Sequence, residues 1–138
     1  MLSDELENEI LDMQDEASLH FKKEEWDEMK KIMFLAWDKL PEPKTKYDQS
    51  FWVARMICEA ALGEKNIPLA KEWVEIYKIA DLERIEGGER FFMEARLAYL
   101  EENFDKAKEL FHQADQMSKG RLFQNPAYVE YLKFYKQK

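Results

Sequence analysis

The hydrophobic positions of this sequence recur every three or four residues, which is the spacing of an amphipathic α-helix. The first such stripe runs from Leu6 to Phe21, and a second runs from Trp26 to Leu40 after a short polar break. Two helices joined by so short a link lie antiparallel. The pattern therefore predicts a helical hairpin over residues 4–40.

The same pattern occurs twice more and is followed by one further helix. Residues 48–82 break at Gly63-Glu64-Lys65-Asn66, and residues 88–118 break at Glu101-Glu102-Asn103, so each range predicts another hairpin. Asn125-Pro126 is a favourable N-cap and first-turn pair that opens a closing helix over residues 126–136. No alternating run of β-branched residues is long enough to predict a strand. The expected fold class is all-α.

The three hairpins align as an internal repeat with spacings of 41 and 37 residues. In the third unit, small residues stand where two helices would cross, and aromatic residues stand beside them. The small residues are Ala95, Ala98, Ala107 and Ala114, and the aromatic ones are Phe91, Tyr99, Phe104 and Phe111. This unit closely resembles the tetratricopeptide (TPR) motif, and the other two resemble it in part.

The resemblance implies a right-handed superhelical stack of three antiparallel hairpins with a C-terminal capping helix. Met29 and Tyr77 stand where the motif has a small residue, so the first hairpin should be more open and the second less regular. A helical bundle without repeat symmetry would show similar aromatic and alanine stripes, and it is the alternative fold.

Composition indicates one domain over residues 1–138, because 138 residues with 46% hydrophobic content suffice for one compact core. No stretch of 18 apolar residues occurs, and the first dozen residues are acidic, so we expect a cytoplasmic protein that does not enter a membrane. The formal net charge of −8 disfavours binding to nucleic-acid phosphates and favours a basic partner.

The sequence shows no constellation of residues suited to catalysis. His20 and His112 each lack a second histidine one turn away, and the single cysteine, Cys58, lies in an apolar stretch. We therefore expect no catalytic residue, no metal and no cofactor. An enzyme or a small-molecule-binding bundle is the third functional interpretation.

The TPR resemblance places a partner on the concave face, which the first helix of each hairpin lines. The candidate partner-binding residues are Gln14, Ser18 and Phe21 in the first hairpin, Trp52, Arg55 and Glu59 in the second, and Phe92, Arg96 and Tyr99 in the third. Aromatic residues beside arginine are typical of interface hot spots.

Arg55 and Arg96 are a candidate pair for binding a carboxylate of the partner. Two intramolecular ion pairs are the competing interpretation, Arg55 with Glu59 and Arg96 with Glu89 or an acid of a neighbouring helix. If the pair forms a binding site, replacing both arginines by alanine should weaken binding and leave thermal unfolding nearly unchanged.

The closing helix adds Tyr128 and Tyr131 to the candidate residues, because it is aromatic on more than one face. It either folds over the last hairpin and fills part of the groove, or forms an interface for a partner or a second copy of the chain.

The leading functional hypothesis is a non-enzymatic protein–protein interaction module that binds a peptide or helix. The alternative is a dedicated acidic inhibitor, like an immunity protein or an antitoxin, of one basic partner protein.

Overall fold

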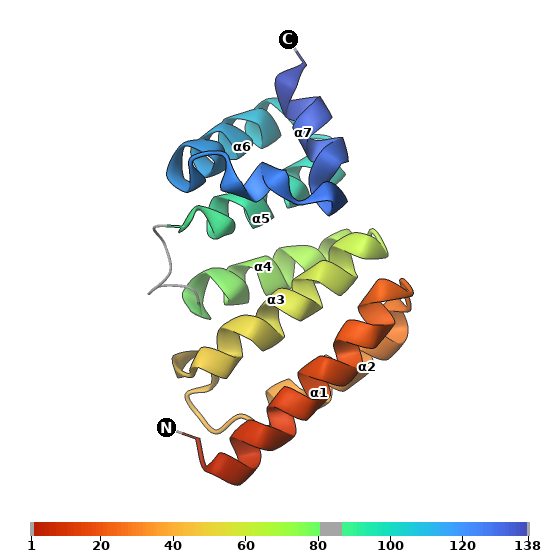
Figure 1. Cartoon of the computed structure of the whole chain (residues 1–138), viewed down its shortest axis with the longest axis vertical. Helices are drawn as coiled ribbons and strands as arrows, with labels where there is room; N and C mark the ends of the chain where they lie inside the picture. Colours follow the sequence, from red (N-terminus) through yellow and green to blue (C-terminus); the bar gives the residue numbers. More distant parts are fainter. Residues whose placement is uncertain (1, 81–86, 138) are drawn as a thin grey trace. The chain divides into compact units, whose positions relative to one another are not determined.

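The computed structural model describes residues 2–80 and 87–137, and within these ranges the chain is helical and contains no strand (Figure 1). The all-α fold class is thereby confirmed. The chain forms two compact units, unit 1 over Met1–Ala80 and unit 2 over Asp81–Lys138, where sequence analysis expected one domain. Residues 81–82, which the second hairpin was expected to include, lie outside the described ranges.

Unit 1 consists of two helical hairpins that pack on each other. Helices α1 (Asp4–Lys22) and α2 (Trp26–Lys39) form the first, and α3 (Asp48–Gly63) and α4 (Ile67–Ala80) form the second. A short 3₁₀ helix, η1 (Lys44–Lys46), connects them, and α2 packs against α3 (Figure 1). Helix α3 is the most deeply buried helix of this unit, because it contacts α4 on one side and α2 on the other.

Unit 2 consists of one hairpin and a closing segment. Helices α5 (Glu89–Leu100) and α6 (Phe104–Ser118) form the hairpin. The closing segment, residues 121–137, contains η3 (Arg121–Gln124), η4 (Pro126–Tyr128) and α7 (Val129–Lys136). Two consecutive residues in the left-handed region, Lys119 and Gly120, turn the chain from α6 into this segment.

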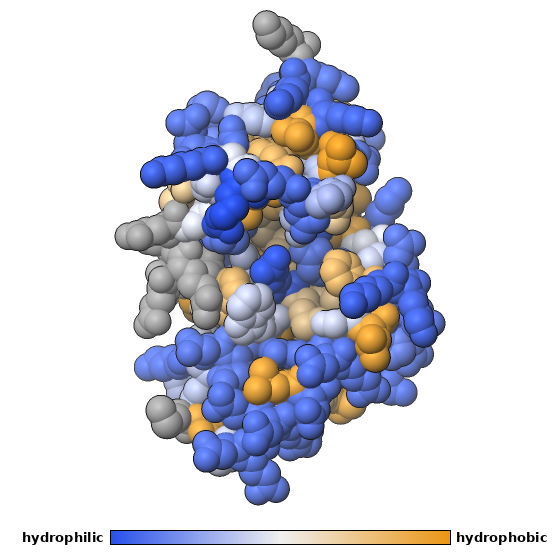
Figure 2. Space-filling model, viewed as in Figure 1, coloured by the Kyte–Doolittle hydropathy of each residue, from blue (hydrophilic) through white to orange (hydrophobic). Residues whose placement is uncertain are grey.

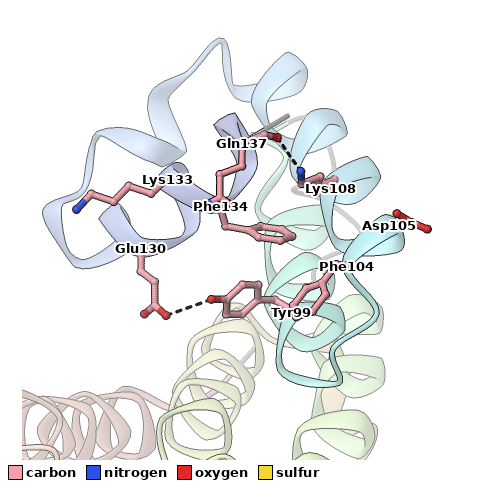
Figure 3. A pocket seen from close by; sticks show the side chains of 8 residues that line it. All are labelled: Tyr99, Phe104, Asp105, Lys108, Glu130, Lys133, Phe134 and Gln137. Carbon is pink, nitrogen blue, oxygen red and sulfur yellow. Dashed lines mark hydrogen bonds between the residues drawn. The ribbon is translucent and has the colours of Figure 1, made fainter.

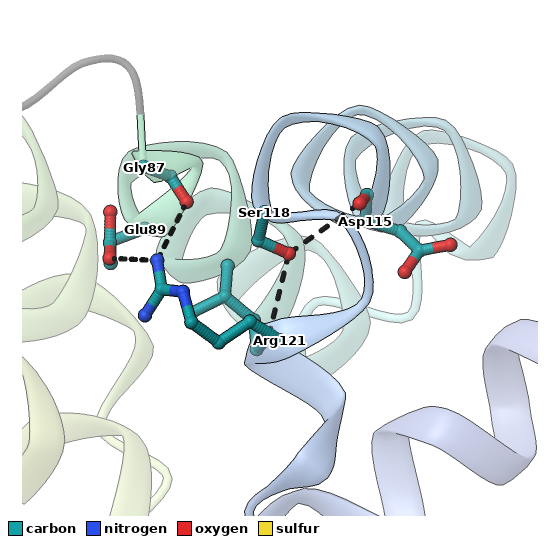
Figure 4. Close-up of polar contacts among 6 residues, drawn as sticks. Gly87, Glu89, Asp115, Ser118 and Arg121 are labelled. Carbon is teal, nitrogen blue, oxygen red and sulfur yellow. Dashed lines mark hydrogen bonds and ion pairs between the residues drawn. The ribbon is translucent and has the colours of Figure 1, made fainter.

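Ion-pair and hydroxyl contacts fix the start of the closing segment (Figure 4). The Arg121 guanidinium lies 3.0 Å from a Glu89 carboxylate oxygen at the start of α5 and also donates to the Gly87 carbonyl. The Ser118 hydroxyl donates to the Asp115 carbonyl and accepts from the Leu122 N–H. These contacts hold the segment against both helices of the hairpin.

All three hairpins turn in the same way. Glu24, Lys65 and Glu102 each occupy the left-handed region, with φ of 57°, 60° and 61°. In each turn the next residue donates its N–H to a carbonyl five residues earlier, at His20, Ala61 and Ala98. Both features recur at the spacings of 41 and 37 residues seen in the sequence, so the repeat is present in the backbone geometry of each turn.

The side chains at four repeat positions are fully buried. These sets are Ala17, Cys58 and Ala95; Met29, Ala70 and Ala107; Met33, Val74 and Phe111; and Ala36, Tyr77 and Ala114. Each of these twelve side chains is at most 1% exposed. Met29 and Tyr77 thus lie inside the fold although they are larger than the motif expects, and the Tyr77 ring contacts Phe51 at 5.3 Å.

Gly63, at the end of α3, gives room to the indole of Trp26. A Cβ atom at residue 63 would lie 2.5 Å from the Trp26 ring. Gly→Ala in a helix ordinarily stabilises by about 0.5–1 kcal/mol. Here we expect Gly63→Ala to destabilise unit 1 by about 1–3 kcal/mol, because the ring must move. Chemical denaturation measures the difference, and a gain in stability would show that the indole moves without cost.

Candidate functional site

The face of α5 that was predicted to bind a partner is covered by the closing segment of the same unit. Arg96 lies with its guanidinium 5.1 Å from the ring centre of Tyr128 and 5.5 Å from that of Tyr131. The Phe92 ring contacts Tyr128 at 4.8 Å and Phe123 at 5.4 Å. Phe92 and Arg96 are therefore only 4% and 6% exposed.

Tyr99 completes this face one turn further along α5. Its ring contacts Phe134 of α7 at 4.8 Å and Tyr131 at 5.4 Å, and its hydroxyl donates to a Glu130 carboxylate oxygen at 3.2 Å. Of the two arrangements considered for the closing helix, the structure has the one in which it folds over the last hairpin. Tyr128 and Tyr131 are half-buried contacts of α5 in this arrangement.

Glu89, the acid considered as a partner of Arg96 on its own helix, is bound by Arg121 instead (Figure 4). The Arg96 guanidinium faces the two tyrosine rings. Because Arg96 is only 6% exposed and its guanidinium lies over two tyrosine rings, replacing it changes packing as well as any binding surface. The structure therefore changes one expectation: Arg96→Ala, unlike Arg55→Ala, should lower the thermal stability of the protein.

In unit 1, the equivalent positions on α3 combine an exposed indole with a cation. Trp52 is 42% exposed, and the half-buried Arg55 guanidinium lies 5.6 Å from the centre of its ring. The Phe51 ring makes an edge contact with the indole, with the ring centres 4.9 Å apart. Glu59, one turn beyond Arg55, is buried at 7% exposure. Sequence analysis placed these three residues on one strip, and α3 carries them on successive turns.

On α1, the predicted residues differ in exposure. Phe21 is 40% exposed and contacts the Trp26 ring at 5.9 Å. Gln14 and Ser18 are half-buried, and the Gln14 amide nitrogen, which is shielded from water, makes no hydrogen bond within residues 2–80 and 87–137.

Sequence reasoning missed Leu11, which stands 41 residues before Trp52 and is 46% exposed. The repeat spacing was a sufficient signal for it. Other exposed hydrophobic side chains are scattered, and Figure 2 shows hydrophobic spots separated by a mostly hydrophilic surface. Leu11 and Trp52 therefore stand out because they share a repeat position.

The two histidines make ordinary hydrogen bonds. His20 Nδ1 lies 2.9 Å from a Glu25 carboxylate oxygen, and His112 Nδ1 lies 3.1 Å from the Tyr135 hydroxyl, which also donates to Asp115. Within the described residues no three histidine, cysteine or acidic side chains converge as metal ligands.

The tyrosine hydroxyls that bind the closing segment make its docking sensitive to alkali. Burial, and then the nearby Glu130 charge, raises the pKa of Tyr99. Burial, and then the Asp115 charge, raises the pKa of Tyr135. A tyrosine whose pKa is higher in the folded chain than in the unfolded chain stabilises the fold. This contribution to the free energy of unfolding is complete below the unfolded pKa of about 10 and is lost as the pH rises through the folded pKa.

We therefore expect the stability of unit 2 to fall above about pH 10 as both hydroxyls ionise. Denaturant unfolding across this pH range, with tyrosinate absorbance recorded in parallel, measures the effect. Tyr99→Phe and Tyr135→Phe should each make the loss less steep. An unchanged slope in both variants would contradict the assignment.

A pocket lies at the tip of the first hairpin in unit 1. The pocket is lined by Trp26 and by five carboxylates, Glu24, Glu25, Asp27, Glu28 and Glu64. Lys30 offsets part of this charge, because its ammonium lies 2.6 Å from Glu64 and 3.3 Å from Asp27. The pocket as a whole is acidic.

No described helix is long and apolar enough to cross a membrane. Comparison with known proteins gives no match: no family model, no curated protein and no solved structure is similar to this chain.

Proposed function

We propose that this protein is a non-enzymatic interaction module that binds a helix or peptide of a partner protein on the first-helix face of its hairpins. In unit 1 this face is formed by α1 and α3. Trp52 and Arg55 are its central residues, with Leu11 and Phe21 as further apolar contacts. In this proposal the hairpins stack as a TPR-like right-handed superhelix, which the shared turn geometry and the buried repeat positions support.

The observation that carries the proposal is the occupied face of α5. There, Phe92, Arg96 and Tyr99 hold a helical segment by ring contacts and by a guanidinium over two tyrosine rings. Arg55 stands at the repeat position of Phe92, 37 residues earlier, and Glu59 at that of Arg96. The same face in the same repeat register thus already binds a helix once within this chain, which supports a helix or peptide as the ligand of α1 and α3.

The residue types on α3 suit such a ligand. An indole presents a large apolar area that loses little conformational entropy on binding, and its ring face attracts cations. Arginine beside it can form two parallel hydrogen bonds with a carboxylate. A partner segment with an apolar anchor and an acidic residue one turn away would satisfy both side chains.

Site-specific photocrosslinking tests the proposal. A photoreactive phenylalanine analogue at residue 52 should capture a partner from native lysate that the same analogue at Ile79 of α4, also exposed, does not capture. With the partner identified and purified, Trp52→Ala should weaken its binding about tenfold or more, which is typical for a hot-spot aromatic residue.

Ile79→Ala is the matched control and should bind the purified partner as the unchanged protein does. Equal capture from both positions, or equal affinity of Trp52→Ala and the unchanged protein, would reject the α3 face as the binding site.

The acidic pocket beside Trp26 favours a second candidate function, inhibition of one basic partner protein. Lysine or arginine side chains of such a partner would meet five carboxylates and the indole there. Charge-removing substitutions distinguish the two functions. Glu24→Gln with Glu28→Gln should slow association and reduce its salt dependence if the partner is basic and binds at this tip, and should have no effect if it binds on α3.

A further inference from the structure

The outer side of α7 carries an apolar residue and two lysines that the docking on α5 does not use. Val129, Lys133 and Lys136 follow one another at i, i+4 and i+7, which places them on one stripe of the helix. Val129 is 49% exposed, and both lysines are exposed. Lys133 points away from the rings of Tyr99 and Phe104 on the hairpin (Figure 3). This stripe therefore faces solvent, while the aromatic rings of α7 pack on the hairpin.

Helix α1 carries an acidic stripe at positions that its repeat equivalent buries. On α3, Val53, Ile57 and Ala60 stand at i, i+4 and i+7 and are fully buried, because α3 packs against both α2 and α4. The residues 41 positions earlier on α1 are all exposed, and they are Asp12, Glu16 and Leu19. Leu19, at 59%, is the most exposed large hydrophobic side chain of residues 2–80 and 87–137. Helix α1 thus presents to water a stripe that the next hairpin buries.

The two stripes match when the helices lie antiparallel. The facing pairs are then Leu19 with Val129, Glu16 with Lys133, and Asp12 with Lys136. Both stripes have the same spacing, about 10 Å from the first to the last residue at 1.5 Å per residue, so that all three pairs form together. A parallel arrangement places an acid against the valine and the leucine against a lysine, and only the central ion pair remains. The pattern therefore selects one orientation.

The four charged side chains of these stripes form no ion pair within the described part of the chain. The other charge of α7 on its exposed part, Glu130, accepts a hydrogen bond from the Tyr99 hydroxyl. The sequence around each stripe has the same sign as the stripe itself. Residues 1–28 contain eleven acidic and two basic residues, a net charge of −9, whereas residues 119–138 contain five basic residues and one acidic residue, a net charge of +4. These opposite charges attract one another across a few ångströms and are screened by salt.

We propose that two copies of this chain associate head to tail, with α1 of one copy lying antiparallel on the outer side of α7 of the other. The occupant is a second copy because the chain itself supplies both halves of the match. The contact joins two different surfaces, so each copy can bind a further copy at its other end. It involves only about two helical turns, which is far less than the roughly 1,200 Å² of a stable interface, so the association is weak. It does not depend on the proposed function, since Trp52 and Arg55 take no part.

Sedimentation velocity of the full-length protein tests the association. The measurement extends to about 1 mM protein, because contacts of this size are populated only at high concentration. At low salt the average mass should rise with concentration. In about 0.5 M salt, where charges are screened beyond roughly 4 Å, it should return towards that of the monomer. In ¹⁵N-correlated spectra over the same concentrations, the amide signals of residues 12–19 and 129–136 should shift.

Charge-reversed variants identify the paired surfaces. Lys133→Glu with Lys136→Glu reverses the α7 stripe, and Asp12→Lys with Glu16→Lys reverses the α1 stripe. Each variant alone should associate about tenfold more weakly or worse, because two ion pairs become two contacts between like charges. An equimolar mixture of the two variants should recover the association, because the reversed stripes match each other and so do the unchanged ones. Recovery also shows that both variants are folded.

Matched controls separate the stripes from net charge and from general apolar exposure. Lys31→Glu with Lys106→Glu makes the same charge change at exposed lysines of α2 and α6, and it should keep the association within about twofold, since distant charges are screened. Leu19→Ala should weaken the association about two- to fivefold by removing apolar contact area. Leu35→Ala, the same truncation at a residue of α2 that is 53% exposed, should leave it unchanged.

A protein that stays monomeric at low salt, an association that salt does not weaken, or shifts outside both stripes would each overturn the proposal. An equal loss in the Lys31 and Lys106 control, or a mixture that does not recover, would do the same. If the reversed α7 stripe unfolds the closing segment, Lys133→Gln with Lys136→Gln replaces it and should weaken the association about fivefold, the effect of losing two exposed ion pairs.

Discussion

Phe111→Ala should lower the free energy of unfolding by about 3–5 kcal/mol, the loss expected when a large aromatic side chain is removed from a closed core. Phe111 is fully buried on α6. Its ring lies 5.5 Å from Phe92 on α5 and 5.6–5.7 Å from Tyr131 and Phe123 in the closing segment. The residue therefore joins the hairpin to the segment that covers it.

The cavity left by this substitution cannot close easily, because the rings around it come from separate elements. We expect the closing segment to lose its fixed packing first, since α7 has only eight residues and a helix of that length is not stable alone in water. Hydrogen exchange should show loss of protection in α7 and α6, and guanidinium unfolding gives the free energy.

Phe104→Ala is the control for this prediction. Phe104 belongs to the same aromatic cluster but is 45% exposed, so its truncation should cost only about 1 kcal/mol. If Phe111→Ala and Phe104→Ala lowered the free energy of unfolding by the same amount, the buried Phe111 ring would not be the main aromatic contribution to the stability of unit 2.

The sequence predicts the helices of this protein well because their signals are local. Hydrophobic spacing identifies the paired helices, and the polar breaks near Glu24, Lys65 and Glu102 coincide with the three left-handed turn residues. Such turns depend on a few neighbouring residues and recur wherever the same hydrogen bonds form.

The candidate site was harder to predict because exposure depends on contacts between residues distant in sequence. Trp52 and Phe92 have the same kind of side chain on equivalent helices, but one is 42% exposed and the other 4%. The two residues stand at different repeat positions, and the closing segment brings Phe123 and Tyr128 onto Phe92. The aromatic character of residues 128–135 indicated an additional interface, but it did not indicate which surface would be covered.

Arg55 and Arg96 also differ in exposure, so we expect their alanine variants to differ in stability. Arg55→Ala should change the free energy of unfolding by about 0.5 kcal/mol or less, because the guanidinium lies over an indole that is itself exposed to water. Its effect should appear in partner binding, where Arg55 provides a hydrogen-bonding cation beside Trp52.

Arg96→Ala should instead destabilise unit 2 by about 2 kcal/mol or more. The substitution removes a buried cation from the faces of Tyr128 and Tyr131, and each such contact is worth about 0.5–2 kcal/mol depending on its desolvation. The buried stem of the arginine is lost as well, which leaves a gap beneath both rings. Thermal melts of the two single variants compare the arginines directly.

Arg96→Lys separates charge from stacking. Lysine keeps the positive charge but has no planar guanidinium, so it should recover only part of the lost stability. Hydrogen exchange of the α7 amides should rise in the order unchanged protein, Arg96→Lys, Arg96→Ala. If Arg96→Ala melts like Arg55→Ala and α7 remains protected, Arg96 does not hold the closing segment, and its face of α5 would again be a candidate for an external partner.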